Sequence, residues 1–134
     1  MRQQILLPAA NRREIKKTFG ISDVIIGRAL KFERNSSRDK RIRAAALSMG
    51  GLIFTGTPAP VTFTPNVATF HNEGDSTIHQ TLGDRMELVI SKTDSSARLI
   101  IDGETAATFE GVTMTGWGSI LFAMQQVYNT LLTR

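Results

Sequence analysis

Basic side chains are concentrated in the first 51 residues of this 134-residue chain, and such a concentration of lysine and arginine is suited to binding a polyanion. The segment carries twelve Lys or Arg residues and four acids, a net charge of +8. Residues 52–134 carry four basic residues and eight acids, a net charge of −4, so the whole chain has a charge of +4. The asymmetry is compatible with a first segment that contacts a polyanion and, equally, with a solvated basic helix face.

Residues capable of catalysis or metal binding are few. The chain has no cysteine, which excludes disulfides, thiolate zinc sites and cysteine nucleophiles and favours a reducing compartment. Its two histidines, His71 and His79, are eight residues apart and have Glu73, Asp75 and Asp84 nearby, but this spacing matches no known metal site. We therefore expect a protein that is not an enzyme and that uses no metal and no cofactor.

The composition is that of a folded protein, with 41% apolar and 21% charged residues. No apolar stretch approaches the roughly 20 residues that cross a bilayer, and the start of the chain lacks the residue order of a signal peptide. We predict a cytoplasmic protein that does not contact a membrane.

Three short helices are predicted to position the basic residues. Asn11 and Glu14 have the spacing of a capping box, and Gly20 is expected to end the first helix. Ser22 is expected to cap a second helix that runs to about Phe32. The core-facing side of this second helix is expected to carry Ile25, Ile26, Ala29 and Leu30.

A third helix is predicted over Arg38–Met49, with its cap within Asn35–Ser37 and its end at Gly50-Gly51. We place a boundary there, between a helical unit of residues 1–51 and a second unit of residues 52–134. The apolar segment Ile5–Pro8 is expected to be extended, either packed on one of the units or paired as a strand.

The second unit is predicted to be an antiparallel β-meander followed by a C-terminal helix, which makes the chain an α+β protein. Asp102-Gly103 is a strong hairpin signal, and a helical apolar period begins at Trp117. The sheet of the same chain is the favoured partner of this helix, and a second copy is the alternative. The expected strands are Leu52–Phe54, Pro60–Thr64, Val67–His71, Thr77–Leu82, Met86–Ser91, Ala97–Ile101 and Glu104–Phe109.

The stretch Glu14–Leu30 resembles a helix-turn-helix, most closely the DNA-binding headpiece of lac-repressor-type bacterial regulators. Gly20-Ile21-Ser22 is similar to the family's Gly-Val-Ser turn, Ile26 falls on a buried position of the recognition helix, and Arg28 falls on a base-contacting arginine. Arg41–Ala46 resembles the family's closing helix, so the resemblance covers residues 11–50 or so. The chain departs from the family at Lys16, where the family has a small residue, and in lacking the family's large sensor domain.

The second helix would enter the major groove by its N-terminus, with Asp23, Val24, Gly27 and Arg28 toward the base edges. Arg28 could donate two hydrogen bonds to guanine, a contact worth about 1–3 kcal/mol of discrimination. Asp23 could accept from cytosine, Val24 could meet a thymine methyl group, and Gly27 would allow close approach. The residues expected to contact phosphates are Arg12, Lys16, Lys17, Ser22, Lys31, Arg34, Asn35, Ser36, Arg38 and Arg41.

The sequence thus predicts a sequence-specific DNA-binding transcriptional regulator, acting on double-stranded DNA as a homodimer, with residues 52–134 for dimerisation or partner binding. No small-molecule ligand is identifiable. A non-enzymatic protein-interaction or structural accessory protein of a phage or mobile element is the alternative. RNA binding is less favoured, because it typically uses aromatic side chains exposed on a sheet, whereas Phe63, Phe70 and Phe109 are expected in the core.

Overall fold

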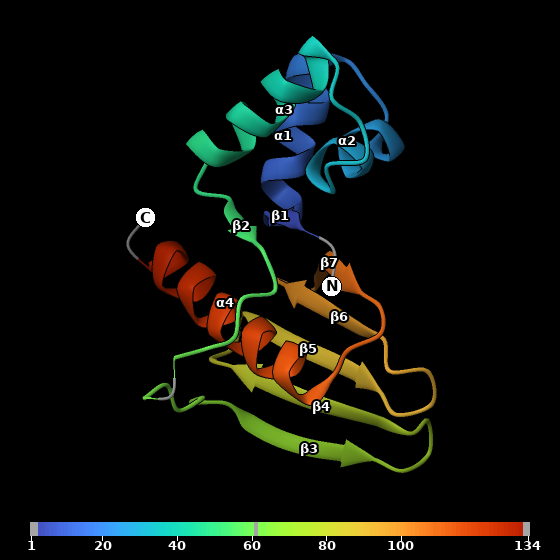
Figure 1. The fold of residues 1–134 in the computed structure, drawn as a ribbon, viewed down its shortest axis with the longest axis vertical. Coiled ribbons are helices and arrows are strands. Elements are labelled where there is room, and N and C mark those ends of the chain that lie inside the picture. Colours follow the sequence, from blue (N-terminus) through green and yellow to red (C-terminus); the bar gives the residue numbers. More distant parts are fainter. Residues whose placement is uncertain (1–2, 61, 133–134) are drawn as a thin grey trace.

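The N-terminal helices lie together at one end of the computed structural model, which describes residues 3–60 and 62–132 (Figure 1). They are α1 (Ala9–Phe19), α2 (Asp23–Leu30) and α3 (Ser37–Ser48), and we call them the three-helix unit. Their shared core consists of Ile5, Leu7, Ile15, Ile26, Ala29, Leu30, Ile42 and Ala46.

The predicted start of α1 is wrong, whereas its predicted end is confirmed. The helix begins after Pro8, so Asn11 lies inside its first turn and forms no capping box with Glu14. Gly20 ends the helix with φ of 65°, a left-handed conformation that glycine adopts without steric cost. A capping box does occur at α3, between Ser36 and Asp39.

Helix α2 ends at Leu30 and not at Phe32 as expected. The Phe32 N–H donates to the Ala29 carbonyl at 3.1 Å, and the Glu33 N–H donates to the Arg28 carbonyl at 3.0 Å. These two bonds form a Schellman motif with Phe32 in the left-handed position, at φ of 58°. A bulky residue there is unfavourable, so its neighbours must hold it.

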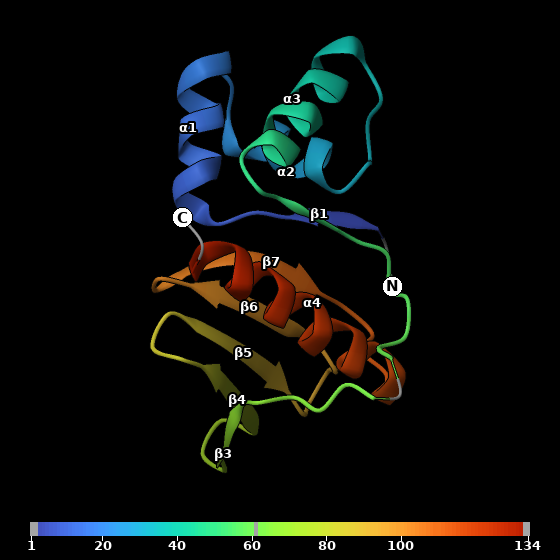
Figure 2. The ribbon, with the colours of Figure 1, turned by 90° about the vertical axis from the view of Figure 1, so that its left-hand side faces the viewer.

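A two-stranded ribbon joins the two halves of the chain. Strand β1 (Gln4–Leu6) pairs antiparallel with β2 (Leu52–Phe54), so the apolar N-terminal segment is a pairing strand, one of the two alternatives left open by the sequence. Its side chains alternate: Ile5 enters the core of the three-helix unit, and Leu6 enters the core on the other side of the ribbon. Figure 2 shows β1 running between the helices and the sheet.

The chain approaches itself closely where α3 gives way to β2. A Cβ added at Gly51 would lie 2.8 Å from the Ala46 carbonyl oxygen and 2.9 Å from Ile5 Cγ2. Only glycine fits this contact without movement of the backbone.

The C-terminal half contains the predicted antiparallel meander, which has five strands in sequential order; the expected strand Leu52–Phe54 lies outside it and pairs with β1. Its strands are β3 (Ala68–Asn72), β4 (Thr77–Leu82), β5 (Met86–Ser91), β6 (Ala97–Ile101) and β7 (Glu104–Phe109). The Asp102-Gly103 hairpin is confirmed, with φ of 52° and 84° at its two turn residues. The expected strand over Pro60–Thr64 is wrong for the described residues 60 and 62–64, which form no strand; Val61 lies outside the described residues.

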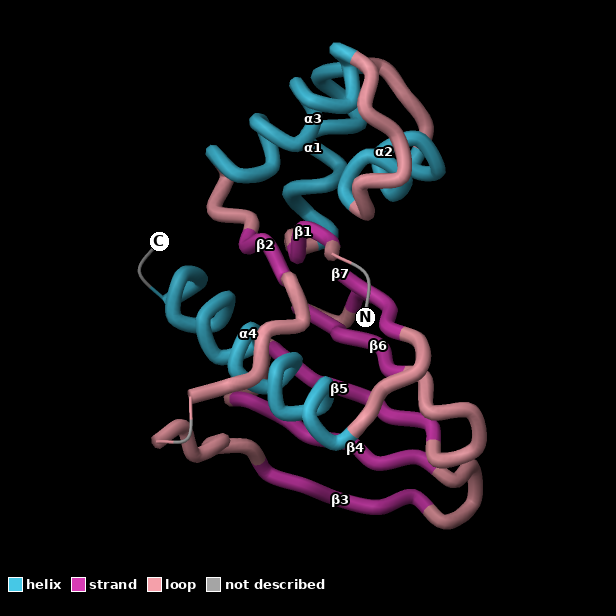
Figure 3. Tube along the Cα trace, viewed as in Figure 1, coloured by secondary structure: helices cyan, strands magenta, loops and turns pink. Residues whose placement is uncertain are grey.

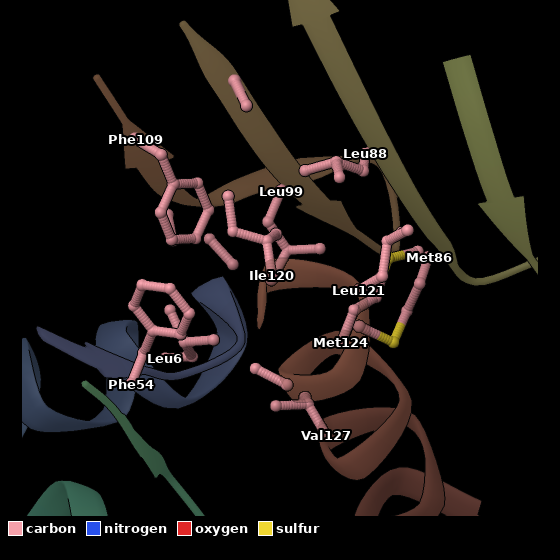
Figure 4. Close-up of a cluster of buried hydrophobic side chains, with 14 of the residues drawn as sticks. Leu6, Phe54, Met86, Leu88, Leu99, Phe109, Ile120, Leu121, Met124 and Val127 are labelled. Carbon is pink, nitrogen blue, oxygen red and sulfur yellow. The ribbon is translucent and has the colours of Figure 1, made fainter. Parts of the chain in front are cut away.

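Helix α4 (Met114–Leu132) covers one face of this sheet, which confirms the sheet of the same chain as its partner (Figure 3). The contact forms the larger core, and Figure 4 shows Leu88 and Leu99 of the sheet near Ile120 of the helix. Leu6 and Phe54 of the ribbon join the same core, and the Phe54 and Phe109 rings meet edge to face at 5.3 Å.

The opposite face of the sheet carries the largest departure from the expected core. Phe109 is buried and Phe63 is half-buried, but Phe70 is 51% exposed and the prediction for it is wrong. Phe70 pairs with His79 across β3 and β4, and the two rings stack at 6.2 Å. Because β3 is an edge strand, its side chains have few neighbours. Among the described residues, no helix is long and apolar enough to span a membrane.

Candidate nucleic-acid interface

Helix α2 presents one buried face and one open face. Ile26, Ala29 and Leu30 pack against α1 and α3, which lie together on one side of α2 in Figure 1. The helix starts at Ser22, whose hydroxyl accepts from the Ile25 N–H at 3.4 Å, so this predicted cap is confirmed. The three-residue turn from Gly20 to Ser22 and the packed helices on either side have the arrangement expected of a helix-turn-helix, without identifying one.

The open face of α2 carries three of the four residues expected to contact bases. Val24 is 61% exposed, a high value for an apolar side chain, and Arg28 and Asp23 are exposed as well. Within residues 3–60 and 62–132, the Arg28 guanidinium has no hydrogen-bond or ion-pair partner, so its donors face solvent. Positions 24 and 28 lie one helical turn apart and share a side of the helix.

Asp23 is paired within the fold. Its carboxylate lies 3.2 Å from the Lys16 ammonium of α1, in an exposed ion pair. Lys16 occupies the position where the lac-repressor-type family has a small residue, and its stem passes out of the helix contact toward solvent. The pair partly neutralises a carboxylate that would otherwise oppose an approaching phosphate.

Gly27, the fourth base-contact candidate, faces a different neighbour. A Cβ added there would lie 3.4 Å from Arg12 Nη2, so the Arg12 side chain lies against this position. Burial lowers the pKa of Arg12, and the nearby charge of Asp23 opposes that shift. Both residues line a cleft that faces β7, together with Lys31 at the end of α2.

The loop between α2 and α3 is held by Arg43, a residue that is 8% exposed. Its guanidinium donates to the carbonyls of Ala29 at 3.0 Å and Arg34 at 2.8 Å, and to the Asn35 side-chain oxygen at 3.0 Å. It also lies 4.7 Å from the centre of the Phe32 ring, a cation–π contact over the left-handed residue. Arg43 therefore fixes the end of α2.

Two of the polar phosphate candidates take part in the same structure. The Asn35 side chain accepts from Arg43, and the Ser36 hydroxyl donates to Asp39 Oδ2 at 2.6 Å and accepts from the Asp39 N–H at 3.2 Å. The hydrogen bond from the Ser36 hydroxyl lowers the pKa of Asp39, and Arg38 and Arg43 add to the effect. Asp39 is 1% exposed, so it serves the fold and not the surface.

The remaining basic candidates differ in accessibility. Lys17, Arg34 and Arg41 are exposed, whereas Arg38 is half-buried and its Nε has no partner among the described residues. The structure thus leaves Lys17, Arg34 and Arg41 exposed on the three-helix unit, and Arg12 and Lys31 line the cleft.

Arg43 is the residue of this region that sequence reasoning missed. The segment Arg41–Ala46 was matched as a whole to a closing helix, with no role for this arginine. Its one local signal is its position four residues after Asp39, between the buried Ile42 and Ala46. That spacing places Arg43 on the inward side of α3.

The described residues contain no group of three or more His, Asp or Glu side chains placed to hold a metal ion. No protein-family model, curated protein or solved structure matches this chain. The geometry of α2 and its surroundings is therefore the basis for a functional proposal.

Proposed function

We propose that this protein is a sequence-specific DNA-binding regulator that reads the major groove with α2. The observation that carries the proposal is the open face of α2: Val24 and the unpaired Arg28 project from a helix whose other side is buried in a unit that belongs to the basic part of the chain. A major groove of about 12 Å admits such a helix, and the Arg28 fork matches O6 and N7 of guanine.

The charge around α2 supports the same reading. Residues 1–51 have a net charge of +8, and Lys17, Arg34 and Arg41 are exposed cations close to α2 in the chain. Contacts from such residues to phosphates orient a protein on the duplex without reading sequence. We take these three as the main phosphate contacts. Arg12 and Lys31 line the cleft and Arg38 is half-buried. The remaining candidates, Lys16, Ser22, Asn35 and Ser36, are bonded within the fold.

The proposal includes a homodimer. Helix α2 has eight residues, so a single copy offers few base contacts. Regulators of this type reach specificity by reading two half-sites about one helical turn apart. The sheet with α4 is the element available for dimerisation, and control of transcription is the role we assign to the assembly.

Fluorescence anisotropy with random duplex DNA, measured from about 50 to 200 mM salt, tests the electrostatic part of the proposal. We expect affinity to fall steeply with salt and to weaken in the double variant Lys17→Ala/Arg41→Ala. Arg98→Ala, on strand β6, removes one exposed charge from the sheet and serves as the control. No binding at the lowest salt would overturn the proposal and favour a protein-interaction accessory role, for which the exposed Val24 would be a contact.

Base reading is tested separately by selecting a preferred site from random duplexes. Arg28→Ala is expected to lose preference at one base pair, by a factor that corresponds to about 1–3 kcal/mol, while nonspecific binding persists. Equal site preference in Arg28→Ala and the unmodified protein would refute the assignment of Arg28.

A further inference from the structure

A cleft of about 110 Å³ separates the three-helix unit from the edge strand β7. One wall carries Arg12 of α1 and Lys31 at the end of α2, and the opposite wall is formed by Thr105–Thr108 of β7. None of the described residues that line the cleft is acidic. Two cations therefore face a small space without a counter-ion on its walls.

Of the groups that line the cleft, the Arg12 guanidinium gives the strongest indication of a ligand. It is half-buried, yet within residues 3–60 and 62–132 no hydrogen bond or ion pair satisfies it. Burial disfavours its charged form, as the lowered pKa of Arg12 shows. A half-buried guanidinium with free donors is suited to a planar, two-oxygen acceptor.

The other residues that line the cleft limit the kind of molecule that can carry this acceptor. Ile5 and Leu30 provide apolar wall, and the Gln4 side chain, which donates to the Thr108 carbonyl at 3.1 Å, adds a polar edge. Inorganic phosphate would leave the apolar wall unused. The volume is somewhat below that of an engineered cavity of about 150 Å³ that holds benzene, so a molecule of about six heavy atoms or fewer fits.

We propose that this cleft binds a small aliphatic carboxylate, with its oxygens at Arg12 and Lys31 and its hydrocarbon part against Ile5 and Leu30. The Arg13–Glu104 ion pair at 2.6 Å joins α1 to β7 and keeps the two walls together. A ligand in the cleft touches both halves of the chain, so its binding depends on how the two halves are placed relative to each other. The proposal does not depend on DNA binding.

Thermal unfolding of the full chain, without DNA and at constant ionic strength, tests the site with sodium butyrate as the probe. Butyrate at about ten times its Kd is expected to raise Tm by roughly 5 °C, and the shift should keep growing with the logarithm of the butyrate concentration. Butyramide, which has nearly the same shape and no charge, is expected to cause no shift. Arg98→Gln, which removes a charge on the sheet, should respond like the unmodified protein.

Arg12→Gln is expected to weaken butyrate binding at least about tenfold, because the two-oxygen contact is lost. If this variant does not fold, Lys31→Gln, which alters the same wall from α2, is expected to weaken binding in the same way. The proposal is overturned if butyrate does not raise Tm, if butyramide or phosphate acts as well as butyrate, or if the full shift persists in folded Arg12→Gln.

Discussion

Replacement of Arg43 by methionine is expected to destabilise the three-helix unit by about 3 kcal/mol. The guanidinium donates three hydrogen bonds, but the acceptors on Arg34 and Asn35 belong to exposed residues and can turn to water. The Ala29 carbonyl belongs to a fully buried residue; it keeps the bond from the Phe32 N–H but loses the charge-assisted bond from Arg43, which is worth about 1.5–3 kcal/mol. Loss of the cation–π contact to Phe32 adds about 0.5–1 kcal/mol.

Urea denaturation followed by circular dichroism measures this effect. A loss of about 3 kcal/mol lowers the midpoint by about 1.5 M at an m-value near 2 kcal/mol/M. Arg41→Met is the matched control: it makes the same change two residues away at an exposed position, and its effect is expected to stay within about 0.5 kcal/mol. If the free energy of unfolding of Arg43→Met lies within 1 kcal/mol of that of the unmodified protein, like that of the control, the assigned hydrogen bonds do not hold α2.

Three further predictions concern stability. Gly51→Ala is expected to destabilise the protein by about 1–3 kcal/mol, because the added Cβ meets a backbone oxygen. Gly118→Ala within α4, where nothing lies within 4 Å of the added Cβ, should stabilise the protein by up to about 1 kcal/mol. Urea midpoints that shift in the same direction for both variants would contradict this. The pKa of Asp39 is lowered below its ordinary value of 3.8, so its stabilising effect is present above that pH and is lost as the pH falls below it. In Asp39→Asn, the free energy of unfolding should therefore fall less steeply between pH 5 and 2 than in the unmodified protein. An equally steep fall in the variant would refute the assignment. Leu6→Ala and Leu7→Ala should each lower the free energy of unfolding by about 2–5 kcal/mol. Because the two side chains enter different cores, amide hydrogen exchange should become faster first in the sheet for Leu6→Ala and first in the three helices for Leu7→Ala. The same exchange pattern in both variants would contradict this.

The parts of the fold that local patterns control could be predicted from the sequence. The strands from Met86 to Phe109 were placed within one residue, because alternation fixes a half-buried strand and Asp102-Gly103 fixes the turn between β6 and β7. The cap at Ser22 and the end of α1 at Gly20 follow from chemistry within a few residues.

The errors arose where a residue depends on distant neighbours. Asn11 and Glu14 have a capping-box spacing, but Pro8 already starts the helix. Phe70 is exposed because β3 lies at the edge of the sheet. The sequence of a single strand does not reveal its position in the sheet. The spacing of Arg43 on α3 indicates an inward side chain, but its partners depend on where the end of α2 meets α3, which no local pattern reveals.

For the candidate site, the sequence supplied the residues but not their partners. It grouped Arg28 with Gly27 on the reading face and Arg12 with the phosphate contacts. The structure leaves Arg28 on the outside of α2 with no partner among the described residues, and it places Arg12 against Gly27 on the side that faces β7. The distinction requires the fold, because it depends on which side of α2 the sheet occupies.

The DNA-binding proposal depends on the placement of α2 more than on its composition. An isolated helix of eight residues is not stable in water, where roughly 12–15 residues are needed. The direction in which Val24 and Arg28 point is therefore set by contacts outside α2: the Ser22 cap at one end and the Arg43 hydrogen bonds at the other. A basic surface serving only solubility would need neither a fixed helix nor an exposed valine beside a free arginine. If α2 reads base edges as we propose, the buried Arg43 holds this short helix in the single orientation that such reading requires.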